Sequence, residues 1–360
     1  MKKAIAVTVL TIILIFSGLS CSKKDTAESA QKAFELRMSG KLDEALKMLE
    51  ESLAQNPDDA AVHFELARTY HHQALGDPRQ LMVIIKKSTD AMDKATALAP
   101  DNIVYAYYGA SIAFYNAYMG LRGDTVTAKN LVGKLCSAYE NTLRLDPEYP
   151  EALLYLTEIY STLPSHYGGD SAKAQAYAAR LEEIDEIFGL KARSLLLGED
   201  GDIIAYWNDI LKTHPGNAAV LEELGKAYWA DEIGPDGNKY IQDALAADPS
   251  RTDLNLDMAR YNYMVSMRNG VLKEFSLNFA EKAIDDYLTT EPIRPMKAFA
   301  LGLLSLIKSK QGDSEKSDSL AAQAEALDPY YSRALGIPPQ ELFTPADEIV
   351  HRHSYLLRPY

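Results

Sequence analysis

Histidine, serine, cysteine and carboxylate side chains could support catalysis or bind a metal, but their spacing in this chain favours neither. His71 and His72 are adjacent, so on a helix they diverge by about 100° and cannot bind one metal ion. His351 and His353 could chelate a metal from an extended tail, and the alternative is that they are ordinary surface histidines. The sequence has no glycine-rich phosphate loop, no Gly-x-Ser-x-Gly elbow and no His-Glu-x-x-His motif. We therefore expect no enzyme, no cofactor and no metal site.

Aromatic and acidic side chains point instead to binding. The 360 residues include 22 tyrosines, and aromatic rings supply large, rigid contact area for peptides or small apolar ligands. The formal net charge is −14, and without Lys2 and Lys3 the chain has 35 basic and 51 acidic residues, a net charge of −16. Such a surface repels nucleic acid and anionic lipid headgroups, so a nucleic-acid partner is not expected.

The N-terminal segment is typical of an exported protein. Lys2 and Lys3 precede an apolar run over residues 4–16, which is too short for a transmembrane helix but has the length of a signal peptide. The sequence Leu19-Ser20-Cys21 after it resembles the lipobox of bacterial lipoproteins. The resemblance implies that Cys21 carries a lipid and that the mature chain faces the periplasm, on the outer membrane. The alternative is that Cys21 merely follows a signal peptide.

The elements that would position a binding site recur along the chain. Prolines follow helix-like stretches at intervals of 43, 47, 68, 34, 43 and 37 residues, and 68 is twice 34. A fixed period in this range predicts stacked helical hairpins. These prolines are Pro57, Pro100, Pro147, Pro215, Pro249, Pro292 and Pro329.

Residues at set distances after these prolines resemble the Leu-Gly-x-x-Tyr core of tetratricopeptide repeats. They are Leu66-Ala67 with Tyr70, Leu156-Thr157 with Tyr160, and Leu224-Gly225 with Tyr228. The resemblance implies an all-α fold, a right-handed α-α superhelix (solenoid) of about seven to eight hairpins. In such an array each hairpin is expected to contact only its neighbours.

The domain boundaries follow from these patterns. We expect a signal peptide over residues 1–20, a lipidated tether over 21–26, the repeat array over 27–328 and a C-terminal cap or tail over 329–360. A bend is expected within 189–201. Asp170 is expected to cap a helix that starts at Ser171.

The same resemblance implies which residues line the concave groove of the array. The first helix of each hairpin contributes them, at positions interleaved with the core. The predicted groove residues are Phe64, Arg68, Tyr107, Phe114, Tyr155, Trp229, Arg260 and Tyr263, with Glu158 and Lys226 as further charged candidates. The alternative is that several of the rings pack against the next hairpin and that pairs such as Glu65–Arg68 and Glu222–Lys226 are ordinary helix-face ion pairs.

Tyr107 and Phe114 are the sharpest case. They lie two helical turns apart on one face, which Tyr118 extends, whereas Tyr108 and Ile112 supply a separate core face. We therefore expect the Tyr107–Phe114 strip to be surplus to hairpin packing.

These features predict a non-catalytic scaffold of the cell envelope that binds a protein or peptide partner in its groove. The alternative is an accessory lipoprotein resembling the T-components of TRAP transporters, which would handle a small apolar ligand and require a closed, aromatic-lined cavity. An enzyme would require polar groups that converge from separate hairpins.

Overall fold

The structure of the chain, a computed structural model, describes residues 28–76, 79–198, 201–231, 234–268, 273–333 and 342–346. Over these residues all regular secondary structure is helical. Within these ranges no helix is long and apolar enough to cross a membrane. The helix over 28–38 is followed by α2 (Leu42–Gln55), α3 (Ala60–Gly76), α4 (Leu81–Leu98), α5 (Ile103–Gly120), α6 (Thr125–Leu145), α7 (Pro150–Thr162), the 3₁₀ helix η1 (Ser165–Tyr167), α8 (Ser171–Ile184), α9 (Glu186–Leu196), α10 (Ile203–Thr213), α11 (Ala218–Ala230), α12 (Gly234–Ala247), α13 (Leu254–Arg268), α14 (Lys273–Leu288), α15 (Arg294–Gln311), α16 (Ser314–Leu327) and the 3₁₀ helix η2 (Tyr331–Arg333).

Short polar side chains set where these helices begin. The Asp170 carboxylate accepts hydrogen bonds from the backbone N–H groups of Ala172 and Lys173, so α8 starts at Ser171 as predicted. Asp124 caps α6 and Asn217 caps α11 in the same way. Each cap satisfies backbone donors that would otherwise lack a partner, and each marks a hairpin turn.

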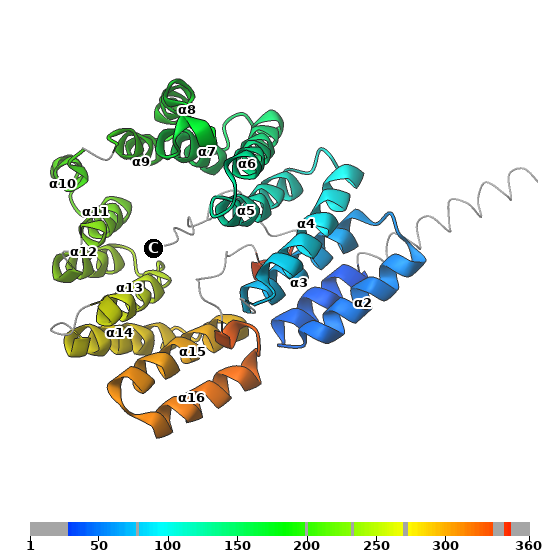
Figure 1. Cartoon of the computed structure of the whole chain (residues 1–360). Coiled ribbons are helices and arrows are strands. Elements are labelled where there is room, and N and C mark those ends of the chain that lie inside the picture. Colours follow the sequence, from blue (N-terminus) through cyan, green and yellow to red (C-terminus); the bar gives the residue numbers. More distant parts are fainter. Residues whose placement is uncertain are drawn as a thin grey trace, which may run out of the picture.

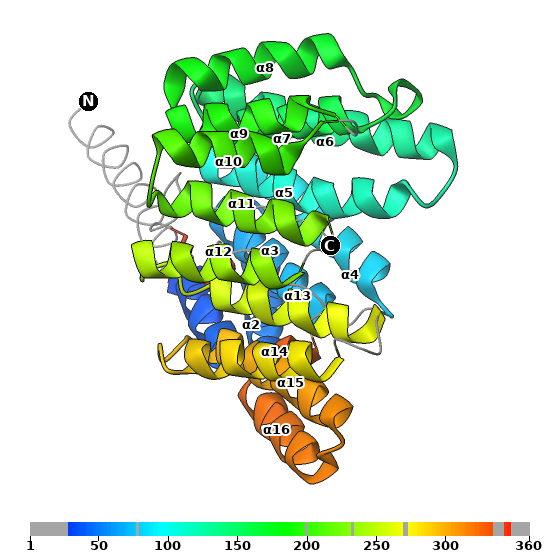
Figure 2. The same ribbon diagram turned by 90° about the vertical axis from the view of Figure 1, so that its left-hand side faces the viewer.

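Successive helices pair into antiparallel hairpins, as the sequence predicts. The closest pairs are α3 with α4, α5 with α6, α7 with α8, α11 with α12, α13 with α14 and α15 with α16. Figure 2 shows the helices stacked as nearly parallel rungs, and Figure 1 shows that the first helices of these hairpins lie on the inner side of a wide turn. The expected all-α solenoid of helical hairpins is confirmed.

The helices α9 and α10 depart from this pairing. α9 packs on α7 and α8, whereas α10 packs on α11. Ile187 and Leu190 of α9 contact the cluster around Trp207, while Ala192 belongs to the cluster of α5 to α8. α9 thus joins two parts of the core. The bend expected within 189–201 stays a prediction, and residues 199–200 lie outside the described residues.

The two ends of the array share one hydrophobic core. A single cluster of buried residues runs from Ala33 and Leu49 through Phe64 to Ile112, and continues from Leu221 to Tyr331 and Leu342. η2 packs on α15 and also contacts α3, so it lies between the two ends of the array. The expectation that each hairpin contacts only its neighbours is therefore wrong, because the turn of the array brings its ends together.

We call this end-to-end contact the seam: Gly40, Gly76 and His72 on one side, and Leu327 to Tyr331 on the other. Gly40 has a φ of 78°, and a Cβ there would lie 2.2 Å from the Leu327 carbonyl oxygen. A Cβ on Gly76 would lie 2.4 Å from the Tyr330 carbonyl oxygen. The backbones approach closely only because both positions lack a side chain.

A histidine–carboxylate pair lies inside the seam. His72 Nε2 is 2.9 Å from Asp328 Oδ2, and both residues are buried. Asp328 also accepts the backbone N–H groups of Tyr330 and Tyr331, so it orients η2. Burial lowers the pKa of His72 more than its hydrogen bond to Asp328 raises it, and Arg37 lowers it further. Within the described residues His72 Nδ1 has no hydrogen-bond partner, so protonation would bury an unpartnered N–H.

Gly225 provides a test of the repeat register. A Cβ at this position would lie 2.8 Å from the Ile241 side chain and 3.0 Å from the Gly237 carbonyl oxygen of the partner helix. Gly225→Leu should therefore lower the free energy of unfolding by roughly 1–3 kcal/mol, measured by urea denaturation. Gly133→Leu is the matched control, because nothing lies within 4 Å of a Cβ there, and it should unfold at the same or a higher urea concentration. Equal stability of the two variants would contradict the register.

The seam predicts a loss of stability in mild acid. His72 faces Asp328, Tyr330, Tyr331, Arg37, His71 and Glu65. Burial first, and then His72 and Arg37, lower the pKa of His71 to about 3.

As the pH falls below 6.5, the unfolded chain takes up protons at both histidines while the folded chain does not. His71 then subtracts up to about 1.4 kcal/mol per pH unit from the stability, and His72, whose pKa is also lowered, acts in the same direction. His71 and His72 therefore lower the melting temperature between pH 7.5 and 5.5, while Asp253, with its pKa raised to about 6, acts in the opposite direction. Over this range His72→Gln should make the melting temperature depend on pH less unfavourably than in the unaltered chain, whereas the exposed control His166→Gln should not. An unchanged slope in His72→Gln would contradict a role for the seam.

Candidate functional site

The eight residues predicted to line the groove separate into two groups by burial. Four expose 5% or less of their surface: Phe64, Arg68, Tyr107 and Trp229. Four are half-buried: Phe114, Tyr155, Arg260 and Tyr263. The role of these eight residues in partner binding stays a prediction, but the buried rings also have clear structural roles.

Tyr107 belongs to the core. Its ring centroid lies 4.8 Å from that of Tyr149 and 6.2 Å from that of Tyr139, and 3% of the residue is exposed. The expectation that Tyr107 is surplus to hairpin packing is therefore wrong, because rings from α6 and from the turn before α7 cover it. Phe114 remains half-buried and stacks on Tyr118, with 6.3 Å between ring centroids. The aromatic strip is thus reduced to Phe114 and Tyr118.

Trp229 also supports the fold. Its ring stacks on Tyr261 of α13 at 4.6 Å between centroids, and its Nε1–H donates to Asn238 Oδ1 of α12 at 3.1 Å. Asn238 and Asn262 exchange two further hydrogen bonds of 3.0 and 2.9 Å. This buried polar network joins three helices, so Trp229 fixes the position of α13 relative to α11. Phe64 is likewise a packing residue, because it stacks on Tyr105.

Arg68 belongs to a built polar site, which we call the arginine site: Arg37, Glu65 and Arg68 with the carbonyl groups of Leu342 and Thr344. Glu65 Oε1 accepts the Nε–H and an Nη2–H of Arg37 at 3.0 and 2.8 Å, and Glu65 Oε2 accepts an Nη1–H of Arg68 at 2.9 Å. Arg37 Nη1 donates to the Leu342 carbonyl at 2.6 Å, and Arg68 Nη2 donates to the Thr344 carbonyl. Both arginines are 0% exposed. The Glu65–Arg68 pair is therefore not an ordinary surface ion pair.

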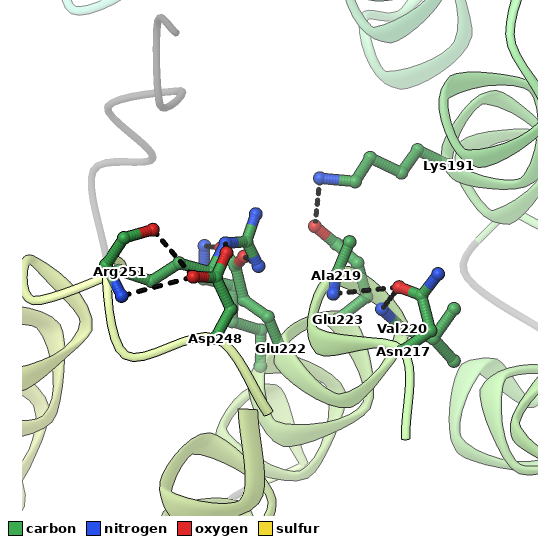
Figure 3. A network of polar contacts seen from close by, with 10 residues as sticks. Lys191, Asn217, Ala219, Val220, Glu222, Glu223, Asp248 and Arg251 are labelled. Atoms are coloured by element: carbon green, nitrogen blue, oxygen red, sulfur yellow. Dashed lines mark hydrogen bonds and ion pairs between the residues drawn. The ribbon is translucent and has the colours of Figure 1, made fainter. Parts of the chain in front are cut away.

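A second set of charges connects α9, α11 and the turn before α13 (Figure 3). We call it the charged inner network: Lys191, Glu222, Glu223, Lys226 and Arg251. Lys191 Nζ is 2.9 Å from Glu223 Oε1, and Arg251 Nη1 is 2.7 Å from Glu222 Oε2. Lys226 donates to the other oxygen of Glu222. These contacts join α9 to α11 and α11 to the turn before α13, and Figure 1 shows these helices following one another along the inside of the turn.

The electrostatics of this network are unusual for a helix surface. Burial alone would raise the pKa of Glu222, but Lys226 and Lys191 hold it below its usual value. Burial, Asp257 and Glu222 together raise the pKa of Asp253 to about 6. Burial also raises the pKa of Asp257, against the opposing effect of Lys226. This part of the inner surface therefore holds charged groups of both signs in a partly desolvated setting.

Several of these residues were not predicted as site residues. Arg37 could have been found, since it shares the apolar face of helix 28–38 with Ala30, Ala33 and Phe34. A charge on a core-facing stripe needs a partner. The pairing of Lys191 and Arg251 could not be predicted from the local sequence, because their partner Glu residues lie about 30 positions away. Within the described part of the chain, no group of three or more His, Cys, Asp or Glu side chains could hold a metal ion.

The comparison with protein families identifies one repeat. Residues 36–77 match the tetratricopeptide repeat model, and they comprise the end of the first helix, α2 and α3. None of the curated proteins matches the chain. The family match thus falls on the helices that carry Glu65 and Arg68.

Solved structures with related helical arrays are only distantly similar. The crystal structure of MamA is 15% identical over 61% of this chain and 95% of that chain, with a TM-score of 0.30. The crystal structure of PilW, described as a widely conserved type IV pilus biogenesis factor, is 17% identical over 75% of this chain and 94% of that chain, with a TM-score of 0.31. The function of this chain has to be inferred from its own inner surface.

Proposed function

We propose that this protein is a non-catalytic tetratricopeptide-type scaffold of the cell envelope, which binds a protein or peptide partner on its inner surface. The observation that carries the proposal is the charged inner network. It links Lys191, Glu222, Lys226 and Arg251 across α9, α11 and the turn before α13. Such a surface suits an extended partner that contacts several repeats at once.

The energetics of the network favour recognition over stability. Removing charges from water costs several kcal/mol per ion, and a buried ion pair often stabilises a fold no more than apolar residues would. Across an interface such charges discriminate among partners, because a partner of unsuitable charge meets a repulsive surface. A network of Glu222, Glu223, Lys191 and Arg251 inside the array is therefore better explained by partner selection than by stability.

Export and membrane anchoring belong to the same proposal. Cys21 lies outside the described residues, as does the whole signal segment. The lipobox-like sequence before Cys21 supports a lipid anchor on the mature N-terminus. We propose that the array faces the periplasm on the outer membrane, where it holds its partner near the bilayer.

The small-ligand alternative requires an enclosed cavity lined by aromatic rings. A pocket of about 350 Å³ lies between helix 28–38 and α2, and it has no aromatic lining. Its lining residues are Lys32, Glu35, Leu36, Ser39, Lys41 and Met48. This pocket does not favour the alternative.

Partner capture tests the inner surface. The full chain, purified from native membranes in mild detergent, should retain a partner. The double variant Lys191→Gln, Arg251→Gln should bind this partner at least about tenfold more weakly, because two interface charges commonly contribute more than about 1.4 kcal/mol. The matched control is Lys86→Gln, Lys282→Gln, because both lysines form exposed ion pairs on second helices, α4 and α14. Unaltered capture by the inner double variant, at unchanged melting temperature, would contradict the proposal.

The anchor has a separate test. Cys21→Ser should release the protein from the membrane fraction or leave an uncleaved precursor, whereas Cys136→Ser should change neither, because Cys136 is buried in the core. Membrane fractionation and mass spectrometry of the mature N-terminus measure both outcomes. A mature N-terminus elsewhere, with a free thiol at Cys21, would refute the lipid anchor.

A further inference from the structure

The C-terminal segment 342–346 lies on the inner side of α3 as a bound peptide would. Leu342 is fully buried in the shared core, and the Phe343 ring lies 5.3 Å from that of Tyr331, measured between centroids. The carbonyl groups on either side of Phe343 accept hydrogen bonds from Arg37 and Arg68. The segment therefore offers one buried side chain, one half-buried ring and two carbonyl groups.

The groups that receive it are held in place by Glu65. Glu65 accepts three hydrogen bonds from the two arginines, and this fixes which N–H groups remain to face the segment. The guanidinium groups of Arg37 and Arg68 each lie 5.3 Å from the centre of the Phe34 ring. Two rigid donors aimed at carbonyl groups two residues apart recognise a backbone, with little dependence on the side chain between them.

The burial of these groups is difficult to explain by stability alone. A buried Arg–Glu–Arg set is often no more stabilising than apolar residues of similar volume. Without the segment, each arginine would lose one carbonyl acceptor, and hydrogen bonds from charged donors are stronger than those from neutral ones. The site thus requires a carbonyl ligand, and any peptide with the same pattern can provide it.

We propose that residues 342–346 are an autoinhibitory ligand of the arginine site, and that a partner peptide with a Leu-Phe pair followed by Thr-Pro displaces them. This inference rests on the proposed function, since it names the peptide chemistry and the regulation of the inner surface. The segment belongs to the same chain, so it competes with a partner peptide as an intramolecular ligand. The apparent affinity for a partner peptide is the intrinsic affinity multiplied by the fraction of molecules in which the site is free.

The chain offers its own probe. A fluorescent peptide with the sequence of residues 340–346, Gln-Glu-Leu-Phe-Thr-Pro-Ala, reports binding by anisotropy. The full-length variant Leu342→Asp should release the intramolecular segment, because a carboxylate cannot remain in the apolar site without a partner. This variant should bind the peptide at least about tenfold more tightly than the unaltered chain, given the competition described above.

Two controls make the result specific. Leu306→Asp changes an apolar residue of α15 that is 51% exposed, and it should bind the peptide as weakly as the unaltered chain does. A peptide with Asp in place of Leu342 should bind none of the three proteins. Failure of Leu342→Asp to gain affinity, with its helical circular dichroism intact, would overturn the proposal even if partner capture on the charged inner network succeeds.

A second measurement covers the case in which Leu342→Asp does not fold. Excess peptide added to the unaltered chain should increase chymotrypsin cleavage after Phe343 several-fold, because displacement exposes that residue. The Asp-substituted peptide should leave cleavage unchanged. No increase with the matching peptide would show that the segment is a permanent part of the core, and would overturn the proposal.

Discussion

Glu65 lies between Arg37 and Arg68 at the contact that joins the two ends of the chain. The two arginines hold residues 342–344 from one side, and His72 holds Asp328 beside them. Because these groups are buried, each one requires the others: a missing carboxylate or carbonyl would leave a desolvated charge. Because the hairpins at the two ends share one hydrophobic core around this contact, the array is closed rather than open-ended.

The hairpins could be predicted from the sequence because their determinants are local. Leu66, Tyr70 and the proline spacing report on residues fewer than 70 positions apart, and Asp170 caps a helix that begins one residue later. The seam could not be predicted in this way. Arg37 and Leu342 are 305 positions apart, and their contact depends on the small rotation that each hairpin adds to the turn.

The predicted groove residues differ from expectation mainly in burial, and the differences have a common cause. Arg68, Lys226 and Arg260 were predicted at groove positions of the repeat. At the first of these the groove is filled by the chain's own C-terminal segment, while Lys226 is paired with Glu222. Tyr107 and Trp229 were predicted at groove positions as well, but neighbouring aromatic rings cover them. Repeat position tells which side a residue faces, whereas burial depends on what the rest of the chain places there.

The shared core also determines the order in which this protein can fold. Residues 28–112 form half of a cluster whose other half begins at Leu221, so the N-terminal hairpins leave the ribosome with an uncovered apolar and charged edge. That edge stays uncovered until Asp328 and Leu342 have been synthesised. Contacts across 250 to 300 positions give the chain a far higher contact order than an open repeat array, and closure is therefore the slow, late step of folding.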